Sequence, residues 1–190
     1  MNVNEFKNTV KNKKISVIGL GISNRPLIKY LVRLGADVTV YDKSTKEQLG
    51  ENYDEFSALG INFVTGENYL DNLTGEIIFK TPGLRFDNPA LLAAKARGSI
   101  VTSEMEVFFD ICPAKIIAVT GSDGKTTTTT LISKMLNEAG YKTWLGGNIG
   151  TPLLCRACEM KKDDIVVLEL SSFQLHTMKK SPHIAVITNI

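Results

Sequence analysis

A strand-like run that leads through a glycine turn into a helix, at residues 115–127, constrains the fold of this chain most strongly. The run is apolar and β-branched up to Thr120, and Gly121 and Gly124 then bracket a tight turn before Lys125. The N–H groups of such a turn and of the helix N-terminus point at an anion, and the helix dipole strengthens the attraction. The run therefore predicts a parallel α/β domain that holds an oligophosphate at the end of a strand.

The turn has the spacing Gly-x-x-Gly-Lys-Thr and is shorter than the usual phosphate loop, which would need glycine where Val119 stands. Lys125 can pair with the terminal phosphates, and the Thr126 hydroxyl can ligate the accompanying Mg²⁺. An ordinary glycine-rich turn between strand and helix is the alternative. The helix that follows is expected to be amphipathic, with an apolar face made by Leu131, Ile132, Met135, Leu136 and Ala139.

Two further polar residues are expected at the same edge of the sheet. Glu169 ends the buried strand-like run at residues 165–169, and a carboxylate beside a phosphate loop is a candidate Mg²⁺ ligand. Asn148 lies in a turn between glycines, where ligands bind in open α/β folds. Asparagine also tolerates left-handed backbone, so a purely conformational role for Asn148 is an equal alternative.

Strand-like and helix-like runs alternate along the chain, which predicts parallel sheets flanked by helices. A second strand–loop–helix cycle begins after residues 104–114, so we divide the chain into domains 1–103 and 104–190. The expected strands are residues 14–18, 37–41, 61–65, 76–79, 100–101, 115–120, 142–145, 164–170 and 184–188. One helix is expected after Ser23 or Asn24, which would cap it, and three more are expected over residues 51–59, 88–97 and 103–109. Two further helices are expected to begin at Lys125 and at Pro152.

The first strand ends in Gly19-x-Gly21-x-x-Asn24, a dinucleotide fingerprint without its third glycine. Asp42 stands about 20 residues further on, where a ribose-binding carboxylate would lie. The pattern favours a nucleotide of some kind, and the missing glycine argues against close packing of NAD. A plain βα turn with a strand-end aspartate is the alternative.

The composition excludes several classes of protein. The 190 residues are 43% hydrophobic and 22% charged, and the net charge of +2 without charged blocks does not indicate nucleic acid binding. No apolar run approaches the ~18 residues of a membrane span, so we expect a cytoplasmic protein. Cys155 and Cys158 form Cys-x-x-Cys, but zinc needs further ligands nearby, so buried structural thiols are expected. His183 is expected to be structural.

Taken together, the motifs resemble the Mur ligase family of peptidoglycan synthesis. The resemblance covers nearly the whole chain and rests on motifs that run in the order of the family. They are Gly19-Leu20-Gly21-Ile22-Ser23, Thr81-Pro82-Gly83, Thr102-Ser103-Glu104-Met105-Glu106, Thr120-Gly121-Ser122-Asp123-Gly124-Lys125-Thr126-Thr127, Gly146-Gly147-Asn148-Ile149-Gly150 and Glu169-Leu170-Ser171-Ser172-Phe173-Gln174-Leu175.

The resemblance implies a Rossmann-like N-terminal domain that holds the UDP of a substrate, followed by a truncated P-loop-type ATPase domain. In the first domain it places Gly21, Ile22 and Ser23 at the diphosphate, Asp42 and Lys43 near the uracil and ribose, and Thr81, Pro82 and Gly83 at the uracil pocket. In the second it assigns ATP to Gly121, Ser122, Asp123, Gly124, Lys125, Thr126 and Thr127, Mg²⁺ to Thr126 and Glu169, and contacts with the rest of the substrate to Asn148 and Ser171.

The implied reaction joins D-glutamate to UDP-N-acetylmuramoyl-L-alanine at the expense of ATP, through an acyl phosphate. Family members continue beyond the position of Ile190, so the resemblance implies a fragment of a monomeric parent that binds but does not ligate. Its last strands are expected to expose an edge through which the fragment self-associates. Two other functions stay open at this point: a nucleotide-dependent switch module and an NAD-dependent oxidoreductase.

Overall fold

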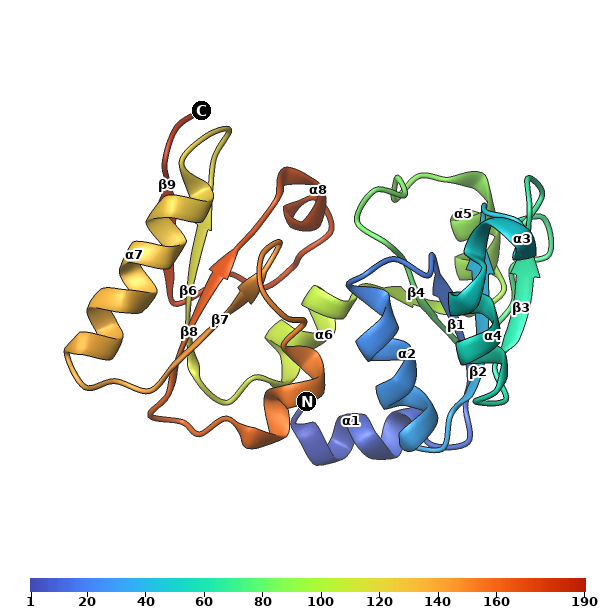
Figure 1. The fold of residues 1–190 in the computed structure, drawn as a ribbon, viewed down its shortest axis with the longest axis horizontal. Helices are drawn as coiled ribbons and strands as arrows, with labels where there is room; N and C mark the ends of the chain where they lie inside the picture. The colour runs from blue at the N-terminus through green and yellow to red at the C-terminus, as the bar shows by residue number, and fades with distance from the viewer. The chain divides into compact units, whose positions relative to one another are not determined.

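The computed structural model describes residues 1–190 and contains two compact units, each built on a parallel sheet with helices (Figure 1). The first unit is Asn4–Glu104, and the second is Met105–Ile190 together with Met1–Val3. Up to the end of the first sheet the elements are α1 (Val3–Val10), β1 (Lys14–Ile18), α2 (Asn24–Arg33), β2 (Asp37–Asp42), α3 (Lys46–Leu49), α4 (Glu51–Ser57), β3 (Asn62–Thr65), β4 (Ile77–Phe79), α5 (Pro89–Ala96) and β5 (Ile100–Thr102). They are followed by α6 (Glu104–Ile111), β6 (Lys115–Thr120), α7 (Lys125–Glu138), β7 (Thr143–Gly147), the 3₁₀ helix η1 (Leu154–Glu159), β8 (Ile165–Glu169), α8 (Ser172–Leu175) and β9 (Ile184–Ile187).

The first sheet has the strand order β3-β2-β1-β4-β5, and every neighbouring pair is parallel. The connections run in opposite directions from β1 and β4, so the order reverses between these two central strands. Right-handed crossovers then place the helices after β1 and after β4 on opposite faces. Ligands of open α/β sheets bind at such a reversal, beyond the carboxyl ends of the strands. The core includes Ile18, Tyr41, Leu73, Ile78, Leu91 and Ala94.

The second sheet has the order β7-β8-β6-β9 and is also entirely parallel. The predicted parallel α/β fold is therefore confirmed for both sheets. Strand β8 is the most deeply buried, since its residues from Val166 to Glu169 are all buried, as expected for a central parallel strand. Strand β9 lies at one edge, with Ile184 and Ile187 more than half exposed at 54% and 62%.

Helix α7 begins at Lys125 as predicted, but its buried face differs from the predicted one. Thr129 and Ser133 are buried at 0% and 5% exposure, whereas Leu131 and Met135 are 53% and 70% exposed. The phosphate turn fixes where the helix starts and therefore which side faces the sheet. Short side chains on that side let the helix lie close to the strands. The predicted apolar face is therefore only partly right, since Ile132 and Leu136 are half-buried but Leu131, Met135 and Ala139 are exposed.

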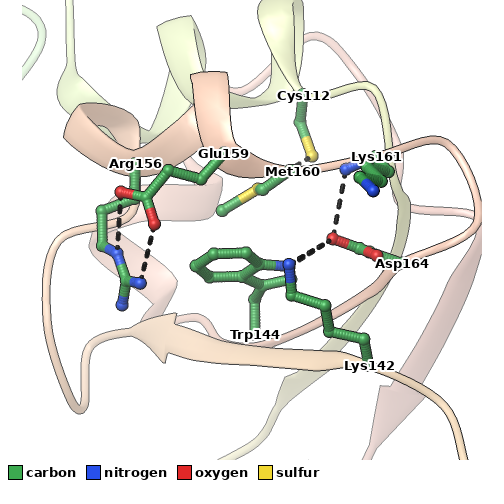
Figure 2. A network of polar contacts seen from close by, with 8 residues as sticks. All are labelled: Cys112, Lys142, Trp144, Arg156, Glu159, Met160, Lys161 and Asp164. Atoms are coloured by element: carbon green, nitrogen blue, oxygen red, sulfur yellow. Dashed lines mark hydrogen bonds and ion pairs between the residues drawn. The ribbon is translucent and has the colours of Figure 1, made fainter.

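A polar network around the only tryptophan, Trp144, anchors the second unit at the start of β7 and β8 (Figure 2). The Trp144 indole Nε1–H donates to the Asp164 carboxylate at 2.8 Å, and that carboxylate also accepts the Lys161 backbone N–H at 3.1 Å. The Lys142 ammonium and the Arg156 guanidinium both lie over the Trp144 ring, 4.7 and 4.6 Å from its centroid. The hydrogen bonds from Trp144 and from the Lys161 backbone lower the pKa of Asp164, and the one from Trp144 has the larger effect.

One helix was missed and two local predictions need correction. The helix expected over 51–59 is α4, but it is preceded by a separate short helix, α3, which a Thr45–Gln48 capping box starts. The helix expected from Pro152 is the 3₁₀ helix η1. Ser23 stands at the N-cap of α2, but its side chain makes no capping hydrogen bond.

Candidate functional site

The turn between β6 and α7 has the backbone of an anion-binding loop. Gly121 and Gly124 have φ angles of 139° and 76°, values that favour glycine. Because Gly124 is the N-cap, no side chain caps the first N–H groups of α7. Unbonded N–H groups at a helix start, together with the helix dipole, attract phosphate oxygens. The backbone at this loop thus fits the oligophosphate predicted from the sequence.

Lys125 lies folded over this loop. Its ammonium donates hydrogen bonds to the carbonyl oxygens of Gly121 and Ser122, at 2.7 and 2.9 Å. The positive charge therefore stands at the turn itself, where an incoming phosphate would meet it. Neutral carbonyls do not cancel this charge, so the ammonium retains its attraction for an anion.

Glu169 lies in contact with two other predicted site residues, Thr126 and Asn148. It ends β8 opposite Val119 of β6, and its side chain belongs to a residue only 2% exposed. Its carboxylate accepts hydrogen bonds from the Thr126 hydroxyl at 2.7 Å and from the Asn148 amide at 3.2 Å. Both donors are uncharged, so neither neutralises the carboxylate, and a buried negative charge favours the approach of a cation.

The oxygens at this point could hold a Mg²⁺ ion. No group of three or more His, Cys, Asp or Glu side chains is arranged to hold a metal ion. Mg²⁺ does not need such a cage, because it usually takes one or two protein oxygens and completes its shell with water and substrate phosphates. The Thr126 hydroxyl and the Glu169 carboxylate, beside the phosphate loop, fit that pattern.

Asn148 is positioned by backbone as well as by its side chain. Its N–H donates to the Glu169 carbonyl at 2.8 Å, while the preceding Gly147 has φ of 95°. A Cβ on Gly147 would overlap the Glu169 backbone, so glycine is required for this close approach. Asn12 is the only non-glycine residue with positive φ, so the conformational interpretation of Asn148 was wrong. Its amide instead faces the buried carboxylate.

Ser171 lies two residues beyond Glu169 and caps α8. Its hydroxyl accepts from the Gln174 N–H at 3.3 Å and donates to the Gln174 side-chain oxygen at 3.0 Å. This capping box orients the short helix. The predicted contact between Ser171 and a substrate stays a prediction.

In the first unit, residues predicted to bind a nucleotide meet at the carboxyl edge of β1, β2 and β4. Asp42 accepts the Leu20 N–H at 2.7 Å with one oxygen and the Ser44 N–H at 2.8 Å with the other. Gly19 lies beside Thr81, which a Cβ on the glycine would approach to 3.9 Å. Asp42 therefore holds the glycine loop, a positioning role that its sequence spacing did not reveal.

The loop after β1 exposes an apolar side chain, and a separate turn follows β4. Ile22 is 82% exposed beside Gly21 and Ser23. The turn that carries Pro82 and Gly83 is closed by a hydrogen bond from the Leu84 N–H to the Thr81 carbonyl at 3.1 Å.

Asn24 replaces the third glycine of the dinucleotide fingerprint and has a structural task of its own. It is 7% exposed, and its amide donates to the carbonyls of Ile18 and Gly19, at 2.9 Å each. The side chain thus occupies the junction between strand and helix where glycine would let a dinucleotide approach closely. From the sequence Asn24 was interpreted as a missing glycine or as a helix cap, and its hydrogen bonds across this junction were not predicted.

The histidine and cysteine predictions have different outcomes. His183 is structural as predicted. Its imidazole Nδ1 accepts the Ile116 backbone N–H at 3.0 Å, and its own backbone N–H donates to the Ile116 carbonyl at 2.9 Å. The prediction of buried thiols was wrong for Cys158, which is exposed, and only partly right for Cys155, which is half-buried. Cys112, for which no burial was predicted, is also half-buried. Burial raises the pKa of the Cys112 thiol to about 11.

Comparison with known families agrees with this geometry. Residues 13–103 match the N-terminal domain of MurD-like Mur ligases, and residues 119–190 match the Mur ligase middle domain. The chain belongs to the Mur ligase family. None of the helices in this Mur ligase chain has both the length and the apolar character needed to cross a membrane.

Curated relatives of this Mur ligase chain share its sequence throughout. It is 61% identical over 189 residues to the UDP-N-acetylmuramoylalanine–D-glutamate ligase of Acetivibrio thermocellus, covering 99% of the chain and 41% of the relative. It is 58% identical over 188 residues to the ligase of the same name from Clostridium novyi, covering 98% of the chain and 41% of the relative. The chain therefore spans about two fifths of the length of these relatives.

Solved structures support the fold of this Mur ligase chain. UDP-N-acetylmuramate-alanine ligase from Thermotoga maritima is 25% identical with a TM-score of 0.51, over 93% of this chain and 41% of that one. UDP-N-acetylmuramate:L-alanyl-gamma-D-glutamyl-meso-diaminopimelate ligase from Neisseria meningitides is 19% identical with a TM-score of 0.53, over 93% of this chain and 60% of that one.

Proposed function

We propose that this chain carries the UDP-substrate-binding and ATP-binding parts of a ligase that adds D-glutamate to UDP-N-acetylmuramoyl-L-alanine in peptidoglycan synthesis. The observation that carries the proposal is the buried Glu169 carboxylate with Thr126 and Asn148, next to the Lys125 loop. Its substrates are inferred from relatives named for them. Because the chain spans 41% of their length, the complete reaction is proposed for the longer protein, and binding alone for these residues.

In the second unit, taken as the first part of a P-loop-type ATPase domain, ATP is proposed to bind at the turn from Gly121 to Thr127. Lys125 would neutralise charge on the β- and γ-phosphates, and the first N–H groups of α7 would bond their oxygens. Thr126 and Glu169 would hold Mg²⁺. The ion, when bound, supplies positive charge to the phosphate oxygens.

The proposed chemistry has two displacements. An oxygen of the alanyl carboxylate forms a bond to the γ-phosphorus of ATP and ADP leaves, giving an acyl phosphate. The amine of D-glutamate then forms a bond to the acyl carbon, phosphate leaves, and the amine loses a proton. Residues at the turn would contribute by positioning and charge neutralisation. Asn148, held against Glu169, and Ser171 would meet the substrate beyond its diphosphate.

The first unit is proposed to anchor the UDP end. Gly21, Ile22 and Ser23 would lie at the diphosphate, with Asp42 and Lys43 near the ribose and uracil. The turn at Thr81, Pro82 and Gly83 would border the uracil. Support comes from the convergence of Gly19, Asp42 and Thr81 at one edge of the sheet, where the strand order reverses. The side chain of Asn24 at the third glycine position weighs against an NAD site.

We further propose that the parent acts in the cytoplasm as a monomer. For the 190-residue chain alone, self-association through β9 is proposed. The support is its place at the edge of the sheet with exposed Ile184 and Ile187. Light scattering across a concentration series would show a rising mean mass; a constant monomer mass at high concentration would contradict this.

Calorimetric titration with MgATP tests the proposed nucleotide site. Lys125→Met should weaken binding at least tenfold, the effect of losing a charged hydrogen-bond partner of ~1.5–3 kcal/mol. Lys134→Met is the matched control, because this exposed lysine lies on the same helix, and it should leave the affinity unchanged.

Glu169→Gln tests the metal site in the same assay. It should remove most of the difference in ATP affinity between solutions with Mg²⁺ and with chelator, because the neutral amide is a poor Mg²⁺ ligand. Equal ATP binding by the Lys125→Met and Lys134→Met variants would contradict the proposed loop. An unchanged Mg²⁺ dependence in Glu169→Gln would contradict the metal site.

A further inference from the structure

Two residues that follow β9 hold the backbone of the phosphate loop from outside it. The Thr188 hydroxyl donates to the carbonyl of Asp123, and the Asp123 N–H donates to the Asn189 side-chain oxygen at 2.9 Å. The Ser122 hydroxyl donates to the same Asn189 oxygen at 2.9 Å. Both backbone groups of Asp123, in the middle of the loop, are thus bonded to a segment more than sixty residues away in sequence.

The same segment is attached to the strand that leads into the loop. Strand β9 pairs with β6 so that Ile187 lies opposite Thr120. The Thr188 N–H then donates to the Thr120 carbonyl at 2.9 Å, and the Thr188 hydroxyl is shared between that carbonyl, at 3.2 Å, and the Asp123 carbonyl. The position of Thr188 and Asn189 is therefore set by the sheet rather than by the loop.

Packing at Gly121 shows how close this contact is. A Cβ added to Gly121 would collide with the Thr188 hydroxyl and would come within 3.0 Å of the Asn189 backbone. The first glycine of the loop is therefore needed for the segment to approach, besides the φ of 139° that it adopts.

We propose that Thr188 and Asn189 are positioning residues of the nucleotide site, which fix the Asp123 peptide groups so that the loop is formed before phosphate arrives. This rests on the proposed function of the loop in ATP binding. A flexible exposed loop loses conformational entropy when a ligand orders it. A loop that is already ordered before the ligand binds avoids much of that entropic cost. We call Thr188 and Asn189 the clamp. The clamp bonds the backbone carbonyl and N–H of Asp123 and does not use its carboxylate, so it does not depend on the side chain at this position.

The test compares Thr188→Val, which keeps the shape but removes the hydroxyl, with Thr188→Ser, which restores a hydroxyl. Asn189→Ala removes the other half of the clamp. Amide hydrogen exchange of Asp123, measured without nucleotide, reads the clamp directly, and calorimetry with MgATP reads its effect on binding. Unfolding followed by Trp144 fluorescence checks that each variant is folded.

Thr188→Val and Asn189→Ala should speed exchange at Asp123 and weaken MgATP binding about tenfold, the effect of one or two hydrogen bonds. Thr188→Ser should stay within about twofold of the unaltered chain, since it keeps the donor. Unchanged exchange in both Thr188→Val and Asn189→Ala would overturn the clamp, as would equal MgATP affinity of the valine and serine variants. Absence of MgATP binding by the unaltered chain would instead overturn the proposed function, and the exchange rates would still decide whether the clamp exists.

Discussion

Replacing Gly147 with alanine tests the tightest backbone approach at the site. Gly147 ends β7, pairs with Glu169 of β8, and has φ of 95°. An alanine there would adopt an unfavourable φ, and its Cβ would collide with the Glu169 backbone. To relieve the overlap the end of β7 must move away from β8, which breaks the 2.8 Å bond from the Asn148 N–H to the Glu169 carbonyl.

The expected loss of stability follows from these three effects. The unfavourable φ costs ~1 kcal/mol, overpacking costs ~1–3 kcal/mol, and the lost hydrogen bond costs ~1 kcal/mol. The total of ~3–5 kcal/mol is a large fraction of the ~5–15 kcal/mol that stabilises a typical domain. Gly140→Ala is the matched control, because Gly140 in the same unit has φ of 86° but no atom within 4 Å of an added Cβ. It should cost only ~1 kcal/mol.

Urea unfolding followed by Trp144 fluorescence measures both variants. Trp144 is the only tryptophan and is 6% exposed on β7 itself, so its emission reports the unfolding of the second unit. A loss of ~3 kcal/mol lowers the midpoint by ~1.5 M if the slope is ~2 kcal/mol/M. Equal midpoints for the Gly147 and Gly140 variants would refute the argument, because the overlap with Glu169 would then have no energetic effect.

Three further outcomes are expected. The hydrogen bond from Trp144 lowers the pKa of Asp164, so the ionised carboxylate stabilises the fold fully above pH ~4 and this stabilisation is lost as the pH falls through the lowered pKa. The difference in stability between the unaltered chain and Asp164→Asn, followed by fluorescence, should therefore shrink below pH ~4. A constant difference would contradict this. At pH 8 iodoacetamide should modify exposed Cys158 before Cys112, whose pKa of about 11 keeps it as a thiol, and peptide mass spectrometry showing the reverse order would count against the described burial. Asn88→Ala removes the N-cap of α5 and should cost ~1 kcal/mol in thermal unfolding, with Asn88→Ser recovering most of it.

Much of the fold could be predicted from the sequence because parallel strands have a strong local signature. Buried runs such as residues 115–120 and 165–169 alternate with helices, and glycine turns mark where the strands end. The meeting of Thr126 with Glu169 could be predicted for the same reason, since the carboxyl ends of parallel strands meet at one edge. The roles of Lys125, Thr126 and Glu169 toward a ligand stay predictions.

Features that depend on long-range side-chain contacts could not be predicted. Nothing local in the sequence indicates that Asn24 closes a strand–helix junction, or that Asn189 bonds a loop that is distant in sequence. The buried face of α7 was also missed, because the loop before it sets the rotation of the helix and places Thr129 and Ser133 against the sheet. Hydrophobic periodicity indicated another face of the helix, because the side chains that α7 buries most deeply are small and polar.

The most direct test of the account is calorimetric titration of the 190-residue chain with UDP-N-acetylmuramoyl-L-alanine, with NADH titrated in parallel. The convergence of Gly19, Asp42 and Thr81 supports a site for the UDP end in the first unit, while Asn24 fills the third glycine position of a dinucleotide site. We expect saturable binding of the UDP-sugar and no binding of NADH. Binding of NADH without binding of the UDP-sugar would contradict it.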